Sequence, residues 1–187
     1  MAEEVKDIKK EENKKPQNNR RERNSKPVRV DDGMDKRLVH VRRVTKVVKG
    51  GRTMRFSALV VLGDGKGNVG MGIGKAGEVP NAIDKASVVA KKAMRKVAVV
   101  NGTIPHEVVG KYGSTNILML PAEEGHGVIA GGAARAVLEV AGVKNIVTKI
   151  HGSTNRINVV RATMNGLLAL KTREEIAARR GKKPEEI

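Results

Sequence analysis

The residues whose spacing could do chemistry are the glycines of the segment Gly63–Ala86, which reads GDGKGNVGMGIGKAGEVPNAIDKA. The runs Gly65-x-Gly67-x-x-Gly70 and Gly72-x-Gly74-x-x-Gly77 both fit G-x-G-x-x-G, which binds a dinucleotide pyrophosphate between a strand and a helix. The first run leads into a second expected strand. The second run approaches a helix, but residues 97–105 offer no acidic side chain for a ribose. The glycine motifs are therefore only weak evidence for a nucleotide-binding site.

Other catalytic groups are sparse. Metal-assisted hydrolysis needs carboxylates that converge on one site. Glu123 and Glu124 are the only adjacent pair between Arg37 and Leu170, and neighbours on a strand face opposite ways. The four histidines lie far apart, and the absence of cysteine excludes disulfides and thiolate metal sites. We expect no enzyme activity, no metal site and no cofactor.

The net charge of the chain predicts a polyanionic partner. The formal charge is +17 over 187 residues. Residues 1–36 hold 11 of the 37 basic and 9 of the 20 acidic side chains, which leaves +15 for the remainder. A folded body that basic is typical of proteins that neutralise phosphates. With no apolar run long enough for a bilayer and no signal core, we expect a cytoplasmic protein.

The scarcity of aromatic residues limits how nucleic acid can be held. Phe56 and Tyr112 are the only aromatic side chains. Single-strand binders stack bases on aromatic rings, so such a platform is excluded. Contacts of lysine, arginine and main-chain N–H groups with the phosphates and 2′-hydroxyls of structured RNA remain.

The first third of the chain is predicted to be a charged extension followed by a basic hairpin. Residues 1–36 have too little apolar content to fold alone. Residues 37–61 favour two strands joined at Gly50-Gly51, as a tight turn with positive φ at both glycines. The cations around this turn indicate an RNA probe; the alternative is a solubilised edge hairpin. They are Arg42, Arg43, Lys46, Lys49, Arg52 and Arg55.

The glycine segment is predicted to be a strand with one bare face, followed by a helix. Residues 69–73 put Val69, Met71 and Ile73 on one face and glycines on the other, which marks close approach of a ligand or another backbone. A helix begins near Pro80, with an expected buried stripe at helical spacing. Asn101-Gly102 is the predicted domain boundary. The stripe comprises Ile83, Ala86, Ala90, Ala93, Met94 and Val97.

The second half alternates strands and helices. Strands are expected at 106–111, 116–121 and 145–150. A helix with a stripe of Ala134, Val137, Leu138 and Ala141 ends at Gly142, and another follows the cap residues 152–155. Thr172-x-x-Glu175 predicts a capping box for a last short helix. The predicted divisions are 1–36, 37–100, 101–172 and 173–187.

Several long motifs resemble one family. They are Val48-Lys49-Gly50-Gly51-Arg52, Val69-Gly70-x-Gly72-x-Gly74-Lys75-Ala76, Glu124-Gly125-x-Gly127-Val128-Ile129-Ala130-Gly131-Gly132 and Gly152-Ser153-Thr154-Asn155-x-Ile157-Asn158. Together they resemble ribosomal protein number five of the small subunit, bacterial type, over residues 37–187. The resemblance implies an α+β fold. A double-stranded-RNA-binding-like domain, with a sheet and one main helix, would precede a two-layer α/β domain with a left-handed crossover.

The resemblance also implies a role. Family members are structural constituents of the small ribosomal subunit that bind ribosomal RNA at the back of the body near the neck. They hold the head relative to the body and influence translational accuracy. They contact small-subunit proteins four and eight, and with proteins three and four they line the channel through which mRNA enters.

Carried over by position, the family's contacts fall on named residues. The implied RNA contacts are Arg42, Arg43, Lys46, Lys49, Gly50, Gly51, Arg52, Arg55, Lys66, Lys75, Asn155 and Arg156. Gly125, Gly127 and Arg135 would meet protein four. Asn116 departs from the family, since some members carry a basic residue there. A free-standing double-stranded-RNA regulator and a nucleotide-dependent enzyme are the alternatives.

Overall fold

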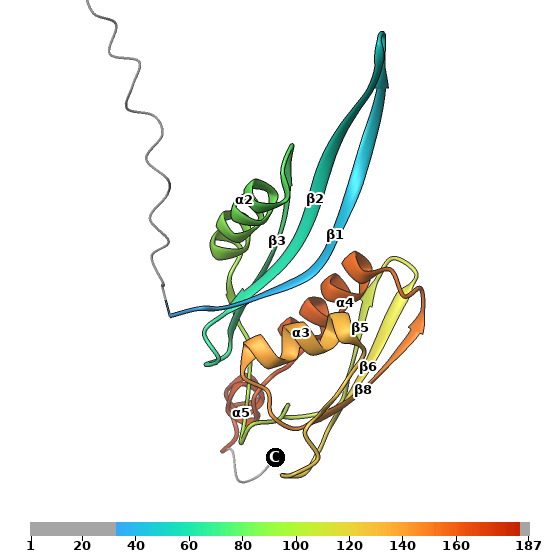
Figure 1. Ribbon diagram of the computed structural model, residues 1–187. Helices are drawn as coiled ribbons and strands as arrows, with labels where there is room; N and C mark the ends of the chain where they lie inside the picture. The colour runs from blue at the N-terminus through green and yellow to red at the C-terminus, as the bar shows by residue number, and fades with distance from the viewer. Residues whose placement is uncertain (1–32, 184–187) are drawn as a thin grey trace, which may run out of the picture. The chain divides into compact units, whose positions relative to one another are not determined.

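The computed structural model describes residues 33–183, so nearly all of the predicted N-terminal extension lies outside it. The first sheet is antiparallel and has the strand order β1-β2-β3-β4. The helix α2 (Val79–Lys92) packs on one face of it (Figure 1). The strands are β1 (Asp35–Val48), β2 (Gly51–Gly63), β3 (Asn68–Ala76) and β4 (Arg95–Lys96).

The second sheet has the strand order β5-β6-β8-β7, and α3 and α4 pack on it (Figure 1). Its short strand β7 is parallel to β8, and α3 is the crossover between them. The expected α+β fold, with a sheet and one main helix followed by a two-layer α/β domain, is confirmed. The elements are β5 (Val108–Tyr112), β6 (Thr115–Pro121), β7 (Val128–Ile129), α3 (Gly132–Ala141), β8 (Ile146–Gly152), α4 (Arg156–Ala169) and α5 (Arg173–Arg180).

The second half of strand β2, residues 57–63, joins two cores because it is buried on both faces. Ala58, Val60 and Leu62 pack with the alanines of α2. The alternate residues Leu59 and Val61 pack into a larger core built mainly from the second sheet, α3 and α4. Since successive side chains of a strand point to opposite faces, the first sheet lies between α2 and the second domain.

The β1–β2 hairpin forms as predicted, but its turn is displaced by one residue. Val48 pairs with Gly51, so the two loop residues are Lys49 and Gly50. Gly50 has a φ of +88°, whereas Lys49 is not among the described residues with positive φ. The prediction that both glycines lie at the centre of the turn was therefore wrong, although the positive φ predicted for both is confirmed, since Gly51 has a φ of +145°. Positive φ at the second loop residue alone is the pattern of a type II turn.

Helix α2 also ends earlier than predicted. It stops at Lys92, and Arg95 and Lys96 pair with the edge of β3 as β4. Val97 is buried in the larger core and does not belong to the helix stripe. The buried positions of α2 are Ala82, Ala86 and Ala90, so the predicted stripe included two of the three and missed Ala82.

The helix boundaries of the second domain follow local capping signals. Gly142 ends α3 with a φ of +88°, and Gly181 ends α5 with a φ of +63°, the left-handed conformation that glycine adopts without a Cβ penalty. Asn155 accepts a hydrogen bond from the backbone N–H of Ile157 at the start of α4. Thr172 accepts one from the N–H of Glu175, as predicted for α5.

Candidate nucleic-acid interface

A two-stranded arm extends from the first sheet. β3 pairs with β2 only as far as Phe56↔Ala76, whereas β1 and β2 continue to the turn at Lys49–Gly50. We define the arm as residues 44–55; it projects beyond β3 and α2 in Figure 1. A two-stranded hairpin by itself is marginally stable in water. We therefore expect a partner to cover an arm of this kind.

The arm and its base carry most of the predicted RNA contacts. Residues 42–55 include six lysines and arginines and no Asp or Glu. All eight predicted positions in this region are exposed: Arg42, Arg43, Lys46, Lys49, Gly50, Gly51, Arg52 and Arg55. Their role in RNA binding stays a prediction, but the structure brings them together on one projection.

The register distributes these cations over both faces of the arm. Arg43 lies opposite Phe56 and Arg52 opposite Val47, on the face that α2 covers lower in the sheet. Arg42, Lys46 and Arg55 lie on the other face, and Lys49 lies in the turn. Because neither face of the arm has a carboxylate, a polyanion can approach the arm from both sides.

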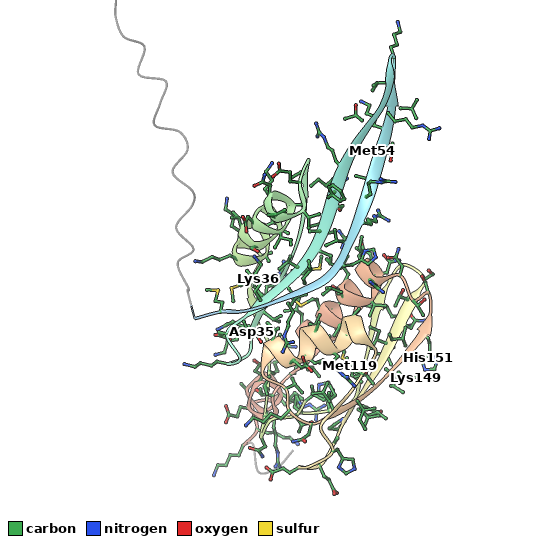
Figure 2. The ribbon with its side chains drawn as sticks, viewed as in Figure 1. Asp35, Lys36, Met54, Met119, Lys149 and His151 are labelled. Carbon is green, nitrogen blue, oxygen red and sulfur yellow. The ribbon has the colours of Figure 1, made fainter. Side chains whose placement is uncertain are left out.

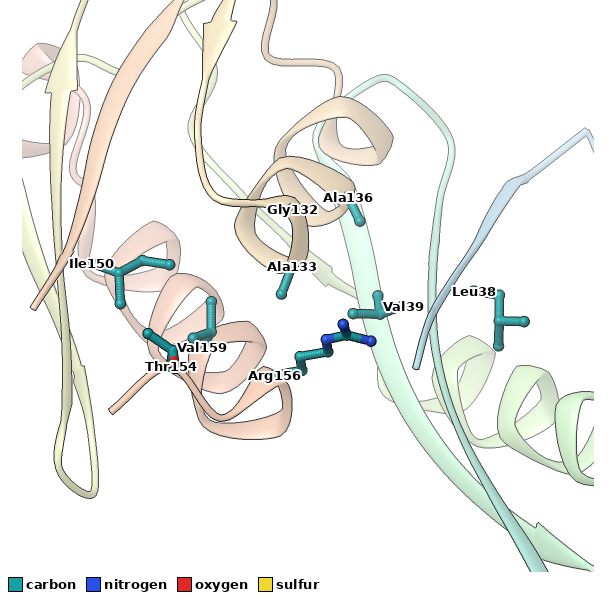
Figure 3. A pocket seen from close by; sticks show the side chains of 9 residues that line it. All are labelled: Leu38, Val39, Gly132, Ala133, Ala136, Ile150, Thr154, Arg156 and Val159. Atoms are coloured by element: carbon teal, nitrogen blue, oxygen red, sulfur yellow. The ribbon is translucent and has the colours of Figure 1, made fainter. Parts of the chain in front are cut away.

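The remaining predicted RNA residues are separated from the arm tip. Lys75 pairs with Ser57, which pairs with Arg42, so Lys75 extends the basic region at the base of the arm. Lys66 lies in the β2–β3 turn, which docks against the end of α3. Asn155 uses its side chain to cap α4. Arg156 is exposed beside a hollow that Val39 and Ala133 also line (Figure 3).

The glycine face of β3 contacts the backbone of α2. Of the two partners expected for this face, a ligand or another backbone, the structure shows the second. A Cβ on Gly70 would lie 2.3 Å from the Ala90 carbonyl oxygen, and one on Gly74 would lie 2.2 Å from that of Ala82. Gly70, Gly72 and Gly74, the three glycines of this face, are all buried. The partner of the glycine face is therefore α2, and this face can hold neither a nucleotide nor RNA.

The β2–β3 turn has a structural role as well. Gly65 N–H donates to the Val140 carbonyl at 3.1 Å, and Gly67 N–H donates to the Ala141 carbonyl at 3.0 Å. The main chain of the first glycine motif thus satisfies the last carbonyl groups of α3. Helix ends leave such carbonyls without an intrahelical partner, so this docking stabilises the junction of the two domains.

Asp64 holds this turn in place. Its carboxylate accepts hydrogen bonds from the Asn68 amide at 2.6 Å and from the N–H groups of Lys66 and Asn68 at 2.8 and 3.0 Å. The Asn68 side chain, followed by these backbone donors, holds the pKa of Asp64 below its ordinary value. The residue is a turn anchor, and its carboxylate is already occupied.

The predicted protein-contact residues fall on a loop and on a helix. Gly125 and Gly127 lie in the loop before β7, with φ of +97° and +70°. The buried Asn145 accepts the N–H groups of both at Oδ1, at 3.2 and 3.1 Å. Arg135 is exposed in the first turn of α3. Asn145 was missed from sequence because a lone Asn before a strand gives no sign of a contact 20 residues away.

No group of three His, Cys, Asp or Glu side chains suited to a metal occurs within residues 33–183. None of the helices in that part of the chain has the length and apolar composition that crossing a bilayer requires.

Comparison with known proteins identifies the family. Residues 34–98 match the model for the N-terminal domain of ribosomal protein S5, and residues 110–180 match its C-terminal domain. The chain is 59% identical over 157 residues to "Small ribosomal subunit protein uS5" of Cupriavidus metallidurans and of Ralstonia nicotianae. That alignment covers 84% of this chain and 91% of each relative. The chain belongs to the ribosomal protein S5 family.

The likeness extends to other bacteria with the same coverage. The protein of that name from Bordetella pertussis is 57% identical over 157 residues, 84% of this chain and 90% of that relative. The arm lies within the S5 N-terminal domain match, and Gly125, Gly127 and Arg135 lie within the S5 C-terminal domain match.

Proposed function

We propose that this S5-family protein is a structural constituent of the small ribosomal subunit and binds ribosomal RNA through its arm. The observation that carries the proposal is the arm with its base, residues 42–55, which has six cations, no carboxylate and two exposed faces. The names of the relatives, all small-subunit proteins, support the same assignment.

The finer role follows the family resemblance. The arm reaches RNA near the neck at the back of the body, and the protein holds the head relative to the body. The loop at Gly125 and Gly127, with Arg135, meets protein four, and protein eight is a further neighbour. With proteins three and four the chain borders the channel through which mRNA enters, and it contributes to translational accuracy.

The salt dependence of RNA binding tests the electrostatic part of this proposal. Phosphate neutralisation releases counterions, so log K should fall linearly with log salt for the full chain and small-subunit RNA. Replacing Lys49 and Arg52 with Ala should lower the affinity and reduce the slope by roughly 1.5, since each phosphate contact contributes about 0.7–0.9. A flat plot for the wild type would contradict the proposal.

A charge-matched variant controls for the loss of net charge. Lys144 is exposed in the second domain, and Lys182 is exposed just after the end of α5. Replacing both with Ala removes the same two charges from other parts of the surface, so the slope should change much less. Equal effects in the two variants would mean that the arm has no special role in RNA binding.

Sedimentation separates a ribosomal constituent from a free-standing regulator of double-stranded RNA. A constituent should migrate with small subunits through a wash of high salt. Loss into the free fraction at moderate salt, with retained binding to duplex RNA, would favour the regulator.

A further inference from the structure

One face of the arm carries exposed apolar side chains that folding does not explain. Val47 is 74% exposed and Met54 is 48% exposed, whereas the opposite face has one exposed apolar side chain, Val48, at 42%. Val47 pairs with Arg52 and Met54 with Thr45, so the register places both apolar side chains on the α2-side face (Figure 2 marks Met54). We call Val47, Met54 and the flanking Arg43 and Arg52 the apolar arm face.

This face continues a buried surface outward. Along β2, Met54 precedes Phe56 by two residues, and Phe56 packs against the core under α2. The sheet thus changes along one face from buried core, through a half-buried ring, to exposed apolar side chains. Natural strands without a neighbour usually carry lysine or other charges, because exposed apolar strands invite aggregation. Exposed Val47 and Met54 on such a projection therefore indicate a surface that a partner covers.

The charge of the arm identifies that partner as a polyanion. Arg43 and Arg52 flank the apolar pair, and residues 42–55 have no carboxylate. An RNA presents apolar ribose and base surface beside its phosphates, especially in the shallow minor groove and at unpaired positions. A protein partner would need an acidic, apolar groove to match both features.

We propose that Val47 and Met54 on the apolar arm face make a non-ionic contact with RNA by covering ribose and base surface, while the flanking Arg43 and Arg52 contact phosphate. The opposite face, with Arg42, Lys46 and Arg55, neutralises phosphate. The arm is consequently enclosed between two segments of RNA. This inference rests on the proposed function, and it adds an apolar contact at Val47 and Met54 to the ionic contacts of the arm.

Two uncharged substitutions test it. Val47→Thr keeps the β-branched shape and Met54→Gln keeps the length, so the strand is preserved while the surface becomes polar. With small-subunit RNA as the probe, the double variant should bind roughly tenfold more weakly, as expected for about 1.4 kcal/mol of lost apolar contact. Its slope of log K against log salt should equal that of the wild type.

The opposite face should behave differently. Lys46→Gln with Arg55→Gln should weaken binding and reduce the slope by roughly 1.5, because two phosphate contacts are lost. Val109→Thr is the matched control for general polarity, since Val109 is 49% exposed on β5. It should leave both affinity and slope unchanged, and circular dichroism should confirm that every variant is folded.

Three outcomes would overturn the inference. Wild-type affinity in the Val47→Thr/Met54→Gln variant would show that Val47 and Met54 serve only strand formation. A reduced salt slope in that variant would show an ionic effect. Normal RNA affinity with failed incorporation into reconstituted subunits would assign the face to a protein. If the wild type itself did not bind the RNA, the proposed function would fail first.

Discussion

The Cα atom of Gly72 in β3 lies directly against the backbone of Ala86 in α2. A Cβ on Gly72 would stand 2.1 Å from the Ala86 carbonyl oxygen and 2.5 Å from the Ala90 nitrogen. Alternate strand residues are about 6.6 Å apart and helix residues four apart are about 6 Å apart. Three glycines can therefore face three alanines in register. This match lets the helix lie directly on β3, while side chains of β2 fill the space beside it.

We expect Gly72→Ala to lower the free energy of unfolding by about 3 kcal/mol, at the upper end of overpacking effects. The added methyl group meets backbone atoms, which cannot rotate away, so the helix must move from the sheet. Urea unfolding of the full chain measures the change.

Gly77→Ala is the matched control for this prediction. Gly77 follows β3, its φ is not positive, and a Cβ there meets nothing within 4 Å. Its unfolding free energy should stay within about 0.5 kcal/mol of wild type. If Gly72→Ala also remained within that range, the close contact between strand and helix would be wrong.

Short-range signals predicted much of the fold. The αL glycine after α3, the Thr172 cap of α5 and the paired strands of the hairpin depend on neighbours in sequence, so their residue types were sufficient. The turn was misplaced because Gly50 and Gly51 are equivalent in sequence. Only the pairing of Val48 with Gly51 distinguishes them.

Long-range contacts were harder to predict. Ala93 and Met94 continue the apolar spacing of α2, but the pairing of Arg95 with Val69 ends the helix, and that pairing is tertiary. The bare face at Gly72 predicted a close approach without identifying α2 as the partner. The division of the arm into two faces required the register, because a one-residue shift exchanges the faces.

The junction of the two domains can be tested at Gly142. Gly142→Ala introduces a side chain at a φ of +88° and places its Cβ 2.1 Å from the Gly65 carbonyl oxygen. Both effects destabilise, so we expect the free energy of unfolding to fall by roughly 3 kcal/mol. Thermal and urea unfolding should agree on the direction.

The variant Gly181→Ala separates the cost of a side chain at positive φ from the cost of the clash with Gly65. Gly181 ends α5 in the same left-handed conformation, with a φ of +63°, but a Cβ there meets nothing within 4 Å. Gly181→Ala should therefore cost only about 1 kcal/mol, the usual penalty of that conformation. Equal losses at Gly142 and Gly181 would mean that the turn at Gly65 does not press against the end of α3.

Asp64 should make the free energy of unfolding depend on pH. Its folded pKa is lowered, so its stabilisation is complete above the unfolded pKa of about 3.9 and disappears as the pH falls through the lower folded value. At pH 7, Asp64→Asn should lower the free energy of unfolding by roughly 1–2 kcal/mol, since hydrogen bonds to the charged carboxylate are lost. Urea unfolding from pH 7 to pH 2.5 should show wild type and variant converging below pH 4.

An exposed carboxylate provides the control for Asp64. Asp84 on α2 is exposed and forms one long ion pair with Lys36, at 3.8 Å. Asp84→Asn should change the unfolding free energy by less than about 0.5 kcal/mol at pH 7, as is usual for surface pairs. A constant difference between Asp64→Asn and wild type across the whole pH range would contradict the role of the charged carboxylate.

The loop that precedes β7 should depend on Asn145, which accepts the N–H groups of Gly125 and Gly127. Asn145→Leu leaves both donors without an acceptor, so the loop should open and the unfolding free energy should fall by roughly 1–3 kcal/mol. Cleavage by a Glu-specific protease at Glu123 and Glu124 should then accelerate, because local opening exposes the backbone. Asn145→Asp keeps the acceptors and should retain the slow cleavage of wild type. Fast cleavage in both variants would mean that the shape of the amide, and not its acceptor oxygen, holds the loop.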